Sequence, residues 1–137
     1  MSQENVESVR GAFERFVATG EPNWDSMDAD VEIYDHDIPD AGLYRGHEGF
    51  LRWLADWSEP WSEFSMKPER WIDAGDRVVV VLRMTAKGKG SGVEVNRRDA
   101  IVYTVRDGKT VRLDYYNNES EALEAVGLSE QDAHADS

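Results

Sequence analysis

Residues 30–49, DVEIYDHDIPDAGLYRGHEG, decide how this chain is organised. An apolar-alternating strand runs into a cluster of acids around His36, and a Pro-Asp-Ala-Gly turn and a Tyr-Arg-Gly segment that opens a helix follow. Ionisable side chains crowded at a strand end are costly to bury unless water, a partner or a ligand satisfies them. The stretch is therefore the first place to look for chemistry.

The residues on either side of this stretch show two periodicities. Apolar residues recur at helical spacing over 3–19, where Gly20 follows, and over 47–58, where Pro60 ends the pattern. β-Branched and alternating runs, with an Asp-Gly hairpin signal at 107–108, predict strands further along. The expected elements are strands at 31–37, 66–72, 77–85, 93–105 and 110–117, a helical turn at 22–27 and a short helix at 119–126.

Helices followed by a run of strands are typical of an α+β fold. The later strands read as an antiparallel meander, which needs one face covered, and the helices are the obvious cover. Because residues 78–81 form an unbroken valine run, both faces of that strand are expected to be covered. One domain is expected over 1–128, followed by a flexible acidic tail at 129–137.

Composition narrows the range of partners. The chain has 137 residues, 40% of them apolar and 31% charged, as in globular proteins, and a net charge of −13. Such a charge repels phosphate backbones and anionic lipid, so no nucleic acid and no membrane are expected as partners. The absence of cysteine excludes disulfides and thiol catalysis. With no apolar signal or spanning segment either, a cytoplasmic location is expected.

Several short motifs resemble one known family when they are taken in order. They are Ala18-Thr19-Gly20-Glu21, Asp30-Val31-Glu32, Pro39-Asp40-Ala41-Gly42, Tyr44-Arg45-Gly46-His47-Glu48-Gly49, Asp73-Ala74-Gly75-Asp76-Arg77-Val78-Val79-Val80 and Arg106-Asp107-Gly108-Lys109. Together they resemble the SnoaL-like polyketide cyclase group of the nuclear transport factor 2-like superfamily, which includes relatives of ketosteroid isomerase and limonene epoxide hydrolase. The resemblance implies a cone-like curved antiparallel sheet wrapped on helices, a pocket between them, and a homodimer through the sheet.

Asp114 is the first candidate for a catalytic base. Its segment resembles the Arg-Asp-Tyr-Phe segment of limonene epoxide hydrolases, whose aspartate activates water. A carboxylate in an apolar pocket loses hydration, its pKa rises, and it becomes a usable base near neutral pH. The alternative is that Asp114 points outward and pairs with Arg112, because Leu113 and Tyr115 indicate that the other face is the core.

Tyr34 and His36 share a strand face and are expected to help hold the substrate or a water, as a Tyr-x-Asn does in the epoxide hydrolases. The alternative is a solvated strand end. Asp35 and Asp37 share the opposite face. One alignment with the ketosteroid isomerases makes Asp35 the proton-shuttling aspartate, and another favours His36 or Asp37. The alternative for Asp35 is a solvated acid without a catalytic role.

A second group of residues is expected to bind ligand. Arg97 and Asp99 form either a pair that binds a carboxylate or carbonyl, or a surface ion pair. Trp53 and Trp57 lie one helical turn apart and are expected to roof the pocket, with simple core packing as the alternative. Tyr115 completes the predicted ligand-binding set.

Departures from the relatives limit the choice of reaction. Phe13 stands where steroid isomerases place a tyrosine donor, their second donor falls near Ile101, and no aspartate follows Arg77 to complete the epoxide hydrolase triad. The loss of two such donors would cost several kcal/mol of transition-state stabilisation, at ~2.7–4 kcal/mol each. A true ketosteroid isomerase is therefore not expected.

The acids around His36, with Asp40 beyond them, fit no standard zinc or calcium site, and His47 and His134 are the only other histidines. No metal and no cofactor are expected. Two hypotheses stay open. The first is an isomerase, cyclase or hydrolase that acts on a small apolar molecule bearing a carbonyl or hydroxyl, with Asp114 as base. The second is a non-catalytic ligand-binding or dimerisation domain.

Overall fold

The computed structural model describes residues 2–37 and 43–128 of the chain. The predicted tail at 129–137 and Asp40 lie outside these residues. Within them, no helix is long and apolar enough to cross a membrane. The elements are α1 (Ser2–Thr19), a 3-10 turn (Trp24–Ser26), β1 (Met27–Asp35), β2 (Leu43–Arg45), α2 (Gly46–Ser58), β3 (Trp61–Ala74), β4 (Arg77–Gly88), β5 (Glu94–Arg106), β6 (Lys109–Tyr116) and α3 (Glu119–Ala125).

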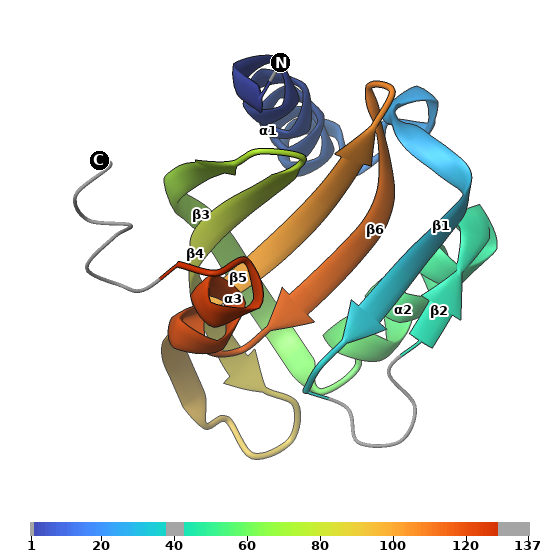
Figure 1. Ribbon diagram of the computed structural model, residues 1–137. Helices are drawn as coiled ribbons and strands as arrows, with labels where there is room; N and C mark the ends of the chain where they lie inside the picture. Colours follow the sequence, from blue (N-terminus) through green and yellow to red (C-terminus); the bar gives the residue numbers. More distant parts are fainter. Residues whose placement is uncertain (1, 38–42, 129–137) are drawn as a thin grey trace.

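The six strands form one curled sheet in the order β2-β1-β6-β5-β4-β3. All neighbours are antiparallel except β1 and β6, which run parallel and bring the acid-rich end of β1 beside the end of β6. Figure 1 shows α3 in front of the sheet and α2 behind it. The predicted α+β class is confirmed, with one parallel pair in an otherwise antiparallel sheet.

Strand alternation gives the sheet two distinct faces. The inner face carries Val31 and Ile33 of β1 and packs on Phe50 and Trp53 of α2, with α1 against one end. The outer face packs at one end on α3, through a cluster that includes Leu123. Residues 78–81 alternate between the two faces and are all 0% exposed, which confirms that this strand is covered on both sides.

β1, β3 and β4 are longer than the pattern predicted, β5 and β6 have the predicted lengths shifted by one residue, and one short strand was missed. β2 has three residues, too few to show a periodicity, and it exists because it pairs with β1, with Tyr44 opposite Ile33. Gly46 then opens α2 with φ +75, and a Cβ there would lie 3.3 Å from the Ala29 carbonyl oxygen. A glycine is therefore needed to turn the chain from β2 into the helix that covers the inner face.

Candidate functional site

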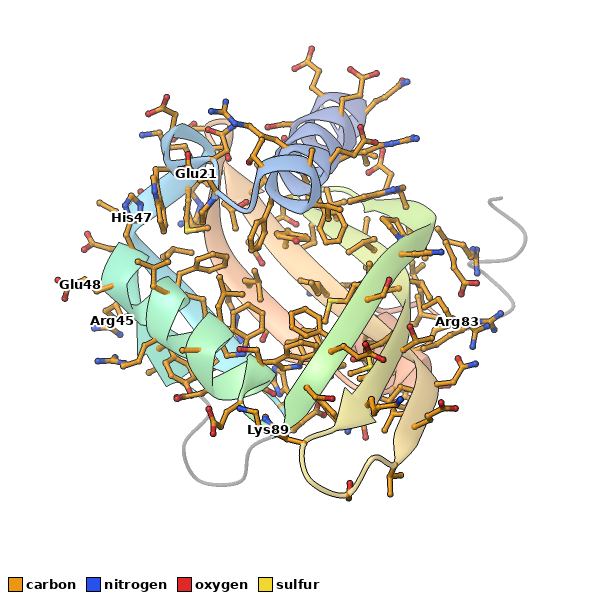
Figure 2. The ribbon with its side chains drawn as sticks, turned by 180° about the vertical axis from the view of Figure 1, so that it is seen from behind. Glu21, Arg45, His47, Glu48, Arg83 and Lys89 are labelled. Carbon is orange, nitrogen blue, oxygen red and sulfur yellow. The ribbon has the colours of Figure 1, made fainter. Side chains whose placement is uncertain are left out.

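The inner face of the sheet and the two long helices enclose a cavity of about 550 Å³. Its wall is mainly aromatic and aliphatic. The lining comes from α1 (Phe13, Phe16, Val17), α2 (Phe50, Trp53, Leu54, Ala55, Trp57, Ser58), β3 (Phe64, Ser65, Met66), β5 (Ile101, Tyr103) and β6 (Leu113, Tyr115). Figure 2, seen from behind, shows side chains filling the space between α1, α2 and β3, while the labelled charged side chains lie at the periphery.

A buried carboxylate stands directly behind this wall. Asp35 is the last residue of β1, faces inward and is 3% exposed. Its Oδ2 accepts a hydrogen bond of 2.8 Å from Nε1 of Trp53, and its Oδ1 accepts one of 3.0 Å from the backbone N–H of Asp37. Because the Trp53 ring lines the cavity, this bond links the wall to an ionisable group.

A second buried carboxylate belongs to Asp99 on β5, which is 0% exposed. Arg97 donates from Nε to Oδ1 at 2.7 Å and from Nη2 to Oδ2 at 3.3 Å. The hydroxyl of Tyr115, another wall residue, also donates to Oδ2. Burial, and then the charge of Asp99, raises the pKa of Tyr115 well above its usual range, so this phenol stays protonated. The predicted pairing of Arg97 with Asp99 is therefore present, and its acid is buried rather than on the surface.

Asp37 completes the polar end of the inner face. Burial raises the pKa of Asp37 to about 6, and repulsion from Asp35 and Asp99 adds to this effect. The backbone N–H of Asn117, which donates to Asp37 Oδ1 at 3.1 Å, and the charge of Arg97 act in the opposite direction. Burial beside two other carboxylates thus shifts the pKa of Asp37 toward neutral pH, although the Arg97 guanidinium opposes the shift.

Asp114 lies in a separate network on the outer face. Its carboxylate is 7% exposed and accepts 2.9 and 3.0 Å hydrogen bonds from Nε and Nη2 of Arg112. Nε2 of His36 lies 2.7 Å from Asp114 Oδ1, and the His36 ring stacks on Tyr116 at 4.2 Å between centroids. The Arg112 guanidinium lies over the Tyr34 ring, 4.0 Å from its centroid.

The structure therefore brings Asp114, His36 and Tyr34 together, as the sequence predicted, but not in the cavity. None of the three lines it, and the alternative in which Asp114 points outward and pairs with Arg112 describes the geometry. The physical reason is strand alternation, since Leu113 and Tyr115 take the inner face and leave Asp114 on the outer one. A catalytic role for these three residues stays a prediction.

The residues of the predicted aromatic roof lie on one cavity wall, and their role in ligand binding stays a prediction. Trp53, Trp57 and Tyr115 all line the cavity, and both tryptophans meet Tyr115 edge to face, at 5.6 and 6.0 Å between centroids. Within residues 2–37 and 43–128, no group of three or more His, Asp or Glu side chains is placed to hold a metal ion.

Two features of the site were missed from the sequence. The hydrogen bond between Trp53 and Asp35 joins residues 18 positions apart on different elements, so no local sequence pattern predicts it. Tyr103 was missed although a signal existed, since it lies on the same face of β5 as Asp99 and Ile101 at a spacing of two residues.

Solved structures of the same fold include several relatives. An NTF2-like protein from Burkholderia xenovorans LB400 is 27% identical, with 85% of this chain and 90% of that chain covered and a TM-score of 0.68. TerC, co-crystallised with polyporic acid, is 23% identical, with coverage of 90% and 98% and a TM-score of 0.70. A hypothetical protein of ketosteroid isomerase-like fold from Catenulispora acidiphila DSM 44928, in complex with trimethylamine, is 21% identical, with coverage of 76% and 78% and a TM-score of 0.60.

No curated protein matches the sequence. The model of the SnoaL-like domain matches residues 9–113, which is most of the chain and includes α2, β3, β5 and the first part of β6. Family match and fold neighbours agree with the resemblance inferred from the motifs. The chain belongs to the SnoaL-like domain family.

Proposed function

We propose that the protein binds a small, largely apolar, ring-bearing molecule with a carbonyl or hydroxyl group in the inner-face cavity. The observation that carries the proposal is a wall of aromatic side chains around about 550 Å³, backed by the buried acids Asp35 and Asp99. Ligand pockets in proteins typically have this size and this mixture of apolar lining and few polar groups. The relative crystallised with polyporic acid supports the proposal, as a case of this fold with a small organic molecule.

The cavity proposal is tested with a neutral fluorescent probe and two matched variants of α2. Leu54→Trp places extra volume in the cavity wall, whereas Leu51→Trp makes the same change at a position that is 50% exposed. We expect 1-aminoanthracene to bind the wild type, Leu54→Trp to weaken binding at least tenfold, and Leu51→Trp to leave it within twofold. Equal affinities for the two variants, or no binding to the wild type, would refute the proposal.

Acid/base catalysis is the second candidate function, and one observation favours it. The Asp35 carboxylate is nearly fully buried and is held by a tryptophan of the cavity wall, without a cation among its hydrogen-bond partners in the described residues. A carboxylate in such surroundings suits proton abstraction next to a carbonyl. In this proposal Asp35 takes the place that the sequence gave to Asp114, because Asp35 lies on the inner face, directly behind Trp53, whereas Asp114 lies on the outer face. Asp35 is not itself among the residues that line the cavity, so proton transfer to it requires the Trp53 side chain to shift. The homodimer implied by the resemblance belongs to the same proposal.

The catalytic part is tested separately by proton exchange in D₂O. Exchange of the hydrogens next to the carbonyl of 2-tetralone, followed by proton NMR, requires a base but no knowledge of the natural substrate. We expect the wild type to accelerate exchange and Asp35→Asn to remove most of the acceleration. If the wild type binds 1-aminoanthracene but accelerates nothing, the non-catalytic binding function stands and the catalytic one falls.

A further inference from the structure

Tyr103 lies near the C-terminal end of β5 with its side chain on the inner face. It lines the main cavity together with Ile101 and Leu113. It also lines a smaller adjoining space of about 60 Å³ under α1, so it stands where the two spaces meet. Every second residue of β5 points to the inner face, as Asp99, Ile101 and Tyr103 do. Tyr103 lies four residues beyond Asp99, which is about 13 Å along the strand at ~3.3 Å per residue.

The hydroxyl of Tyr103 has no hydrogen-bond partner among residues 2–37 and 43–128, in contrast to Tyr115, which donates to Asp99. Burial alone raises the pKa of Tyr103 well above its usual range, so the group is a neutral phenol at any physiological pH. Its surroundings are apolar, with Val78 opposite it on β4 and Leu113 opposite it on β6. Tyr103 is half-buried and its hydroxyl is not among the fully buried polar atoms of the described residues, so the hydroxyl keeps accessible surface that a bound molecule can reach.

Another donor of the cavity wall belongs to Trp57, beside β3. Trp57 packs edge to face on Phe64 at 4.9 Å, and Phe64 is 50% exposed. The two wall residues near the acids, Trp53 and Tyr115, already donate to Asp35 and Asp99 within the protein. Tyr103 is thus the wall residue that offers an unused hydroxyl at the α1 end, far from the acids.

We propose that the Tyr103 hydroxyl is the polar anchor of the cavity and donates a hydrogen bond to a carbonyl or hydroxyl oxygen of the bound molecule. This inference rests on the proposed function, since it assigns the polar atom that a ligand of the cavity must satisfy. It also restricts the ligand class. The molecule carries an acceptor oxygen at the α1 end, on a rigid ring system that extends toward Trp53 and Tyr115.

The test compares two tricyclic probes of nearly the same shape, fluorene and 9-fluorenone, which differ by one carbonyl oxygen. Each is titrated against bound 1-aminoanthracene on the wild type and on Tyr103→Phe. We expect Tyr103→Phe to weaken the affinity for 9-fluorenone at least fivefold and to leave the affinity for fluorene within twofold of the wild type. The infrared carbonyl band of bound 9-fluorenone should move to higher frequency in Tyr103→Phe, because the hydrogen bond to the carbonyl is lost.

Tyr44→Phe is the matched control, since it removes a hydroxyl outside the cavity, where Tyr44 donates to Asp56 at 2.7 Å. This variant should leave the affinity for both probes unchanged. The anchor role of Tyr103 is refuted if Tyr103→Phe changes the affinities for both probes alike, or changes neither, and leaves the carbonyl band in place. The cavity proposal stands in that case. If no probe displaces 1-aminoanthracene from the wild type, both proposals are refuted together.

Discussion

Asp37 gives the sharpest quantitative prediction, because its raised pKa makes stability depend on pH in a known direction. The folded state holds the proton of Asp37 up to about pH 6, whereas the unfolded chain releases it near 3.8. The stabilisation that this proton supplies is therefore full below pH 3.8 and is lost as the pH rises through about 6. Asp37→Asn, which never ionises, should gain stability relative to the wild type over that window.

The size of the effect follows from the shift. Moving the pKa from 3.8 to about 6 corresponds to about 3 kcal/mol at full strength. Because Asp37 is only half-buried, solvent screening reduces the effect to about 1.5 kcal/mol. About 1.2 kcal/mol of this stabilisation is lost between pH 4.0 and pH 7.5, so the stability gain of Asp37→Asn should grow by that amount over this range.

The assay is urea unfolding of the wild type and Asp37→Asn at pH 4.0, 5.0, 6.0 and 7.5. The asparagine Oδ1 can still accept from the Asn117 backbone, so the hydrogen bond of 3.1 Å is preserved. Asp30→Asn, which removes an exposed carboxylate of β1, is the matched control for the loss of one negative charge. A stability gain of Asp37→Asn that does not grow between pH 4.0 and pH 7.5 would refute the reasoning.

Two further predictions concern the two networks. Tyr115→Phe removes a buried donor to a charged acceptor, so unfolding free energy should fall by about 1.5–3 kcal/mol and Tm by about 5–10 °C. Tyr34→Phe, whose acceptor Glu32 is part-exposed, should lower Tm by under half as much, and equal losses in calorimetry would contradict this. Asp114→Asn should leave the affinity for 1-aminoanthracene and the 2-tetralone exchange rate within twofold, because Asp114 faces away from the cavity. A large loss of the exchange rate in Asp114→Asn would contradict this prediction and would support Asp114 as the catalytic base.

The architecture could be predicted from the sequence because periodicity reports which surfaces must be covered. The helical spacing in 3–19 and 47–58 and the valine run at 78–81 each record burial that the structure shows. The length of β3 and the existence of β2 could not be predicted in this way, since both depend on pairing with a neighbouring strand. Val17 fits the helical stripe but is 64% exposed at the cavity, where no side chain packs over it.

The candidate site was predicted as a set of residues rather than as an arrangement. Sequence reasoning chose Asp35, His36, Asp99 and Asp114, and the structure pairs all four with partners. It could not divide them between faces, because an isolated strand does not reveal which of its two faces meets the helices. Leu113 and Tyr115 carried that information for β6, and they favoured the outward placement of Asp114.

The acid-rich end of β1 is stable because alternation splits it into two separate networks. Asp35 and Asp37 turn inward, where Trp53 and backbone N–H groups are their donors, while Tyr34 and His36 turn outward to Arg112 and Asp114. A buried acid with an arginine partner is tied to that partner, as Asp99 and Asp114 are. Asp35 and Asp37 both accept from neutral donors, but Asp35 is the one that is bonded to a side chain of the cavity wall, Trp53. That difference in partners, rather than proximity in the sequence, is what singles out Asp35 as the acid on which the chemistry of the cavity should depend.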